Sequence, residues 1–148
     1  MDESIERTVQ RLADLEDIRQ LKARYFRAVD LKLWDLFADL FTDDLEIDFA
    51  ESTSNPMTRE QFVESARCHF EGGLSVHHGH VPEIEIVDET HARGIWPMFD
   101  LVETPAESTY ESHTGYGHYT EEYRKEDGVW KISRTRLSRI KRVVLQPE

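Results

Sequence analysis

The spacing of apolar residues changes from a helical period to a strand period at Gly72-Gly73, about halfway along this 148-residue chain. Upstream, apolar side chains recur every three or four residues, as on one face of a helix; downstream they alternate with polar ones. Helices followed by strands are typical of an α+β domain whose helices cover one face of a mainly antiparallel sheet. The length suits a single domain over residues 1–148.

Two helices are expected at the N-terminus, separated by a joint at Asp30–Lys32. The second is short, runs from Leu33 to Phe41, and is ended by the turn residues Thr42-Asp43-Asp44. The first is long and amphipathic, with a stripe formed by Ile5, Val9, Leu12, Leu15, Ile18, Leu21, Tyr25 and Val29.

A short strand and a third helix should follow before the period changes. Leu45–Phe49 alternates apolar and acidic residues as a strand would, and Ser52–Pro56 is a polar loop. Thr58 and Gln61 then have the spacing of a capping box, which predicts a helix over about 58–71.

The second half predicts four strands with short turns, as an antiparallel meander, over 84–86, 94–96, 110–123 and 129–144. Trp96 and Met98 share one strand parity, while Ile95, Phe99 and Leu101 share the other, so both faces of the sheet are apolar. Such a sheet needs a cover on each side. We expect the second cover to be another copy of the chain, in a homodimer or homotrimer.

Composition narrows the possible partners and the compartment. Thirty acidic against eighteen basic residues give a net charge of −12, which disfavours binding to nucleic acid or to an anionic membrane surface. The single cysteine, Cys68, cannot form an intrachain disulfide or a thiolate metal site, which favours a reducing, cytoplasmic compartment. There is no signal-peptide pattern and no apolar run long enough to span a membrane.

The adjacent pair His77-His78 is the strongest candidate for chemistry. If strand parity continues through Pro82, His78 lies on the same face as Ile84 and Ile86, toward the helices, and His77 faces the other way. Because the two side chains would diverge, the pair is not a metal motif, and the remaining histidines form no recognisable metal cluster. A structural alternative for His78 is a core histidine bonded to a carbonyl.

Carboxylates and a tyrosine could complete such a site. Asp30 could accept a hydrogen bond from the imidazole, fixing its tautomer and strengthening it as a base, or could simply cap the second helix. Tyr25 is a candidate hydrogen-bond donor and otherwise a core aromatic; it reaches the same cavity as Asp30 only if the helix ends near Asp30. Asp100 shares parity with Trp96 and Met98, and burial there would raise its pKa and suit it to acid/base work.

The last strand is strongly basic, with Arg134, Arg136, Arg139, Lys141 and Arg142. Arg134 and Arg136 share the parity of Trp130 and Ile132, so they could clamp a substrate anion; a solvated strand that balances the acidic remainder is the simpler interpretation.

Several of these segments resemble the SnoaL-like branch of the nuclear transport factor 2-like superfamily. The motifs are Ile18–Leu21 with Tyr25 and Asp30, Asp35–Asp44, His77-His78, Pro82–Ile86, Ala92–Trp96 and Asp127–Ile132. The resemblance implies a cone-shaped α+β barrel with three N-terminal helices packed on a curved sheet. In catalytic members an aspartate at the end of the first helix pairs with a strand histidine that removes a substrate proton, which implies those roles for Asp30 and His78. It likewise implies catalytic roles for Tyr25 and Asp100.

The sequence and the resemblance together predict a cofactor-independent lyase or isomerase of the dehydratase or cyclase type. Its substrate would be a small hydrophobic cyclic molecule, and no metal is expected. The alternative is a non-catalytic ligand-binding or assembly module, like the small subunits of aromatic-ring dioxygenases in the same branch. The residues expected to form the apolar pocket wall are Trp34, Phe49, Trp96, Met98 and Tyr116.

Overall fold

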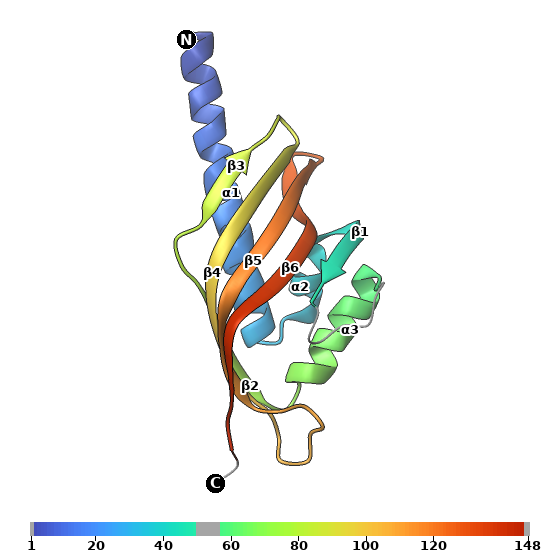
Figure 1. The fold of residues 1–148 in the computed structure, drawn as a ribbon. Helices are drawn as coiled ribbons and strands as arrows, with labels where there is room; N and C mark the ends of the chain where they lie inside the picture. The colour runs from blue at the N-terminus through green and yellow to red at the C-terminus, as the bar shows by residue number, and fades with distance from the viewer. Residues whose placement is uncertain (1, 50–56, 147–148) are drawn as a thin grey trace.

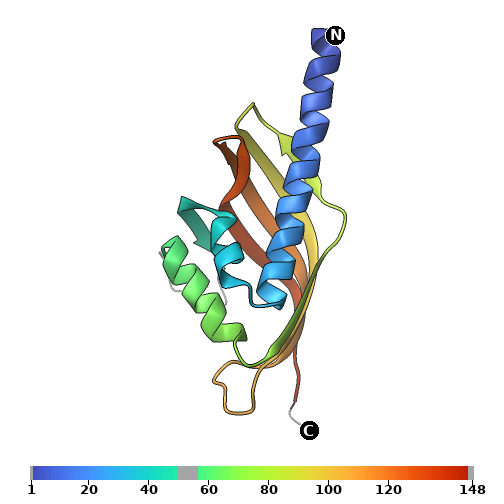
Figure 2. The ribbon, with the colours of Figure 1, turned by 180° about the vertical axis from the view of Figure 1, so that it is seen from behind.

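The computed structural model describes residues 2–49 and 57–146. In this part of the chain three helices lie against one face of a curved six-stranded sheet (Figures 1 and 2). The helices are α1 (Glu3–Asp30), α2 (Trp34–Asp39) and α3 (Arg59–Phe70). The capping box predicted at the start of α3 is present. The Thr58 hydroxyl accepts from the Gln61 backbone N–H, and the Gln61 side-chain oxygen accepts from the Thr58 backbone N–H. The predicted loop at Ser52–Pro56 lies outside the described residues.

The strands are β1 (Phe41–Asp48), β2 (Leu74–Gly79), β3 (Glu83–Ile86), β4 (His91–Glu103), β5 (His113–Glu126) and β6 (Val129–Val144). Their order is β1-β6-β5-β4-β2, and β3 also pairs with β4. Only β1 and β6 run parallel; the other described pairs are antiparallel. The α+β class and the β4–β6 meander are therefore confirmed, within an open sheet.

The predicted boundary between the second helix and the first strand is wrong. Thr42-Asp43-Asp44 does not form a turn after α2 but lies inside β1. Phe41 and Thr42 are buried beside β6, and the parallel pairing of β1 with β6 supplies hydrogen-bond partners that local turn propensity does not anticipate.

The apolar stripe of α1 is buried only in the C-terminal half of the helix. Leu15, Ile18 and Leu21 are in the core, whereas Ile5, Val9 and Leu12 are about half exposed. Figure 2 shows the reason: the N-terminal half of α1 projects beyond the end of the sheet. The amphipathic pattern predicts the helix correctly but not how much of it the domain covers.

Two β-bulges in β6 change which side chains face the helices. The first leaves Ser133 as an extra residue between the pairs Tyr123–Ile132 and Glu122–Arg134, and the second leaves Ile140 extra between Gly117–Arg139 and Tyr116–Lys141. A bulge reverses the parity of the residues that follow it. The expectation that Arg134 and Arg136 share the face of Ile132 is therefore wrong: both are exposed on the outer face. Instead, Arg139 and Arg142 face inward.

No helix among the described residues is long and apolar enough to span a membrane. On the outer face of the sheet, Ile95, Tyr116 and Ile140 are substantially exposed. The expected cover by a second copy remains a prediction.

Candidate active site

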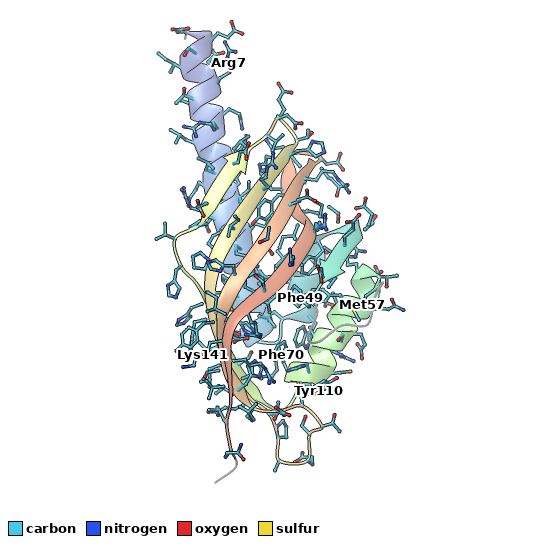
Figure 3. The ribbon with its side chains drawn as sticks, viewed as in Figure 1. Arg7, Phe49, Met57, Phe70, Tyr110 and Lys141 are labelled. Carbon is cyan, nitrogen blue, oxygen red and sulfur yellow. The ribbon has the colours of Figure 1, made fainter. Side chains whose placement is uncertain are left out.

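A cavity of about 660 Å³ lies between the helices and the part of the sheet nearest α3. Figure 3 shows Phe49, Phe70 and Tyr110 in this region, with Lys141 on the other side of β6 and Arg7 at the distant end of α1. The apolar wall of the cavity includes Val29, Phe37, Phe49, Phe62, Phe70 and Leu137. Its polar lining includes His69, His77, Asp100, Tyr110, Glu111, His113, Arg139 and Arg142. An apolar chamber with converging polar groups is typical of a small-molecule site.

His77 and Asp30 make the closest polar contact beside this cavity. The Nδ1 atom of His77 lies 2.7 Å from Oδ1 of Asp30, and the His77 backbone N–H donates to Oδ2 at 2.8 Å. The Ser75 hydroxyl donates to Oδ1 at 3.0 Å. A carboxylate can only accept these bonds, so Nδ1 carries the imidazole proton and Nε2 is left as the basic atom. The end of α1 thus orients a histidine of β2 from behind.

The prediction that His78 faces the cavity is wrong. His78 is exposed on the outer face beside Phe99, while His77 is buried and pairs in register with Asp100. Parity does not continue from β2 to β3, because β2 ends at Gly79 and β3 begins at Glu83, after Pro82. Ile84 packs on the core from the second segment, as predicted, but this says nothing about the face of His78.

Asp100 is on the inner face, as its parity predicts, but its ionisation differs from the prediction. Arg139 holds it in a bidentate pair, with Nη1–Oδ1 at 3.0 Å and Nη2–Oδ2 at 2.9 Å. Burial acts to raise the pKa of Asp100, but hydrogen bonds from His113 and Arg139 and the charge of Arg139 outweigh it and hold that pKa well below its usual range. Asp100 is an ionised carboxylate, 4.0 Å from Nε2 of His77, and not the predicted acid.

Gly115 makes room for this ion pair. A Cβ atom at position 115 would overlap the Nη1 atom of Arg139 and the Oδ1 atom of Asp100. The absence of a side chain on β5 therefore allows the guanidinium to lie flat against the strand and reach Asp100.

Tyr25 lines the cavity and is hydrogen-bonded to Tyr119, another residue of the wall. Burial, followed by the negative charge of Glu121, raises the pKa of Tyr25 well above its usual range. Its hydroxyl thus stays protonated and can donate a hydrogen bond into the cavity. As the sequence suggested, Tyr25 reaches the same cavity as His77 because α1 ends at Asp30.

Of the predicted wall residues, only Phe49 lines the cavity. Trp96 and Met98 are buried in the core, and the Trp96 indole donates to Tyr123 at 2.9 Å. Trp34 packs on Phe37, and its indole donates to Glu71 at 3.1 Å. Tyr116 lies on the outer face against Phe99.

Sequence reasoning missed part of the polar lining. His69 comes from the last turn of α3 and stacks on Tyr110, with ring centroids 4.2 Å apart. Burial, and then repulsion from the basic groups His113, His77 and Arg142, lowers the pKa of His69 to about 4. The sequence places Arg139 and Arg142 in the basic last strand but does not show that they face the cavity, because their orientation depends on the bulges of β6.

Within residues 2–49 and 57–146, no three His, Cys, Asp or Glu side chains are placed to hold a metal ion.

Comparisons with known proteins agree with this architecture. A family model described as the SnoaL-like domain matches residues 10–136. A structure named as a candidate scytalone dehydratase from Novosphingobium aromaticivorans DSM 12444 superposes with a TM-score of 0.81 and 21% identity, covering 95% of this chain and 93% of that one. The hexachlorocyclohexane dehydrochlorinase LinA-type3 from Novosphingobium barchaimii LL02 gives a TM-score of 0.78 and 23% identity, over 93% and 94% of the two chains.

A third structure, named as a candidate aromatic ring hydroxylase from Novosphingobium aromaticivorans, gives a TM-score of 0.78 and 18% identity, over 90% and 94% of the chains. At these identities the three likenesses establish a shared fold, which hosts different named activities. The family match covers most of the sequence, and the helices packed on a curved sheet agree with it. This chain therefore belongs to the SnoaL-like domain family.

Proposed function

We propose that this protein is a cofactor-independent lyase or isomerase that removes a proton from a hydrophobic cyclic substrate, with His77 as the general base. The observation that carries the proposal is the 2.7 Å contact between Nδ1 of His77 and Asp30 beside a cavity that His77 lines. This contact directs the unprotonated Nε2 away from Asp30. An imidazole held in one tautomer beside an apolar chamber is suited to proton transfer.

In the proposed reaction, Nε2 accepts a proton from a carbon next to a carbonyl, and the C–H electron pair forms an enolate. The imidazolium then lies between two carboxylates, Asp30 at 2.7 Å from Nδ1 and Asp100 at 4.0 Å from Nε2. Both stabilise its positive charge. The imidazolium next returns the proton, either to another carbon in an isomerisation or to a departing hydroxyl, which leaves as water, in a dehydration.

The Tyr25 hydroxyl would donate a hydrogen bond to the substrate oxygen that gains negative charge. Its raised pKa keeps it a donor rather than a proton source, which suits stabilisation of an enolate. Asp100, in this proposal, acts as a fixed negative charge rather than as the second acid that its sequence position suggested.

The direct test is deuterium exchange at the carbon next to the carbonyl of cyclic ketones in D₂O. Cyclohexanone, α-tetralone and β-tetralone would first be tested for binding by calorimetry, and exchange of those that bind followed by proton NMR. We expect exchange to be faster than the buffer rate, and His77→Gln to slow it by about 10²-fold or more.

His78→Gln is the matched control, because it removes the same side chain from the adjacent residue on the outer face. It should leave exchange unchanged. Equal exchange in wild type and His77→Gln, for a ketone that binds both, would remove the basis of the proposal. Binding without exchange would favour the alternative of a non-catalytic binding module.

We also propose a cytoplasmic location, with which the free, exposed thiol of Cys68 is consistent. In addition, we propose that the protein self-associates through the outer face of the sheet, where Ile95, Tyr116 and Ile140 are exposed. Light scattering should give a mass of two or three chains, and Ile140→Glu should reduce it. A wild-type mass of one chain would contradict the proposal of self-association.

A further inference from the structure

The cavity has a second functional region, formed by Arg139 and Arg142, which the bulges at Ser133 and Ile140, respectively, turn inward. Arg139 and Arg142 are three residues apart, yet both lie on the cavity face, opposite Gly117 and Gly115 of β5. Bulges commonly re-aim side chains beside functional sites. The two arginines, however, differ in how strongly they are bound by other side chains.

Arg139 already has an internal partner. Both of its terminal nitrogens are hydrogen-bonded to Asp100, at 2.9 and 3.0 Å, and its side chain is largely buried. A guanidinium bound in this bidentate way has committed its best donors. Arg139 therefore serves to hold Asp100, and a ligand would have to displace that carboxylate to reach it.

Arg142 has no comparably strong contact among those described. Its Nη1 atom lies 3.5 Å from Oε2 of Glu111, and its Nη2 atom lies 3.4 Å from Nδ1 of His113. Both distances are at the long end for hydrogen bonds, and a guanidinium has five N–H donors. The Arg142 side chain is 33% exposed, so water or a ligand can reach it.

The imidazoles around Arg142 add to its preference for a negative ligand. Nδ1 of His113 lies 3.4 Å from Nη2 of Arg142 and 3.3 Å from the Glu111 carbonyl oxygen, and Nε2 of His113 lies 3.5 Å from Oδ2 of Asp100. His69 lies at the same end of the cavity, near the basic groups His113, His77 and Arg142. A carboxylate placed here would be attracted to the guanidinium of Arg142 and could accept a hydrogen bond from the imidazole N–H of His69.

Glu111 is the acidic group that would compete with such a ligand. Its side chain is 61% exposed, and its contact with Arg142 is long. An exposed ion pair of this kind contributes little, so Glu111 can rotate into solvent when a better-placed carboxylate arrives. The apolar part of the same ligand would contact Phe70 and Val102, which line the cavity nearby.

We propose that Arg142, assisted by His113 and His69, forms a carboxylate-binding subsite, and that the substrate of this protein is a hydrophobic cyclic carboxylate. This rests on the proposed function for the identity of the reacting end. Arg142, His113, Asp100 and His77 form a continuous series of contacts, so an anchored carboxylate would place the ring beside Nε2 of His77.

The test compares two ligands that differ only in charge, β-naphthoate and β-naphthamide, by isothermal titration calorimetry at about pH 7.5. Wild-type protein should bind the carboxylate about ten-fold more tightly than the amide, as expected of a charge-assisted arginine contact. Arg142→Gln should abolish that preference and leave the affinity for the amide within about two-fold. Glu111→Gln should strengthen carboxylate binding, because the competing anion is gone.

Lys141→Gln is the matched control. It removes the same charge from the neighbouring residue, which is exposed on the other side of β6 (Figure 3), so it should keep the preference for the carboxylate. Arg142→Lys serves if Arg142→Gln folds poorly by circular dichroism; it keeps the charge but not the fork, and should lower the preference without removing it.

Equal affinity of wild type for the two ligands, no measurable binding of naphthoate, or a preference that survives in Arg142→Gln would each overturn the subsite. The His77→Gln variant separates this result from the catalytic proposal. It should retain the preference for the carboxylate even though it loses deuterium exchange, so either proposal can fail while the other stands.

Discussion

Two of the polar clusters that join α1 to the sheet differ in whether they face the cavity. The Nζ atom of Lys22 lies 2.9 Å from Glu121 of β5, and both side chains are 0% exposed. Two turns later, Asp30 lies 2.7 Å from His77 of β2, with 19% and 7% of the two side chains exposed. The distances are similar, but the surroundings are not.

The Lys22–Glu121 cluster is sealed and fully partnered. Glu121 accepts from Thr135 at 2.7 Å and from Tyr123 at 2.9 Å in addition to Lys22, and the Lys22 ammonium lies 3.7 Å from the ring centres of both Tyr25 and Tyr119. Neither Lys22 nor Glu121 lines the cavity. The Asp30–His77 cluster leaves Nε2 of His77 toward the cavity. A buried charge pair is thus a structural element when every atom is partnered, and a candidate for chemistry when one is left open.

Removing Lys22 should have the largest effect. Lys22→Met leaves the Glu121 carboxylate buried without its cation, so we expect the free energy of unfolding to fall by about 3–5 kcal/mol. Urea denaturation followed by circular dichroism measures this. The double variant Lys22→Met/Glu121→Gln should recover part of the loss, because no lone charge remains. A loss below about 1 kcal/mol in the single variant would show that the sealed cluster is not structural.

Crowding the Asp100 ion pair should have an intermediate effect. Gly115→Ala places a methyl group where Arg139 and Asp100 now meet, and we expect a loss of about 1–3 kcal/mol from the forced displacement. Deuterium exchange should fall as well, because Asp100 moves relative to His77. The control is Thr114→Ala, which changes the residue next to Gly115 in the sequence. Gly128→Ala would not serve as a control, because Gly128 has a positive φ. Thr114→Ala should change stability by less than about 0.5 kcal/mol.

Changing Asp30 should separate stability from activity. Asp30→Asn keeps the size of the side chain but weakens its bonds from Ser75 and from the Nδ1 and backbone N–H of His77, so we expect a loss of about 1–2 kcal/mol. Exchange should fall by about 10²-fold or more, because the imidazole loses the charge that fixes its tautomer. A stability loss as large as that of Lys22→Met, with exchange retained, would mean that the two clusters do the same structural work.

The sequence predicts the architecture well because hydrophobic period is a property of whole segments. It predicts α1, the capping box at Thr58 and the β4–β6 meander, and it identifies Asp30 and the histidine pair. It assigns the wrong histidine because one interruption near Pro82 separates β2 from β3 and parity cannot be carried across it. It does not predict that Arg139 and Arg142 face the cavity, for a related reason: each bulge in β6 is a single extra residue, and no residue type marks its position.

The cavity end of the molecule should also respond to pH, through His69. The pKa of His69 is lowered to about 4, from an ordinary value near 6.5 in the unfolded chain, by burial and by the nearby basic groups. Between these two values the unfolded state binds the extra proton, so stability should be complete above about pH 6.5 and should fall as the pH drops toward 4. Between about pH 7 and pH 4.5 the free energy of unfolding should fall in both wild type and His69→Gln. Because His69 is only partly buried, we expect the fall in His69→Gln to be smaller than that in wild type by about 1 kcal/mol. Urea midpoints at the two pH values measure this, and equal losses in the two proteins would show that His69 is not held neutral by its surroundings. The comparison cancels the carboxylates, which titrate in both proteins, so the difference reports the cavity end of the molecule alone.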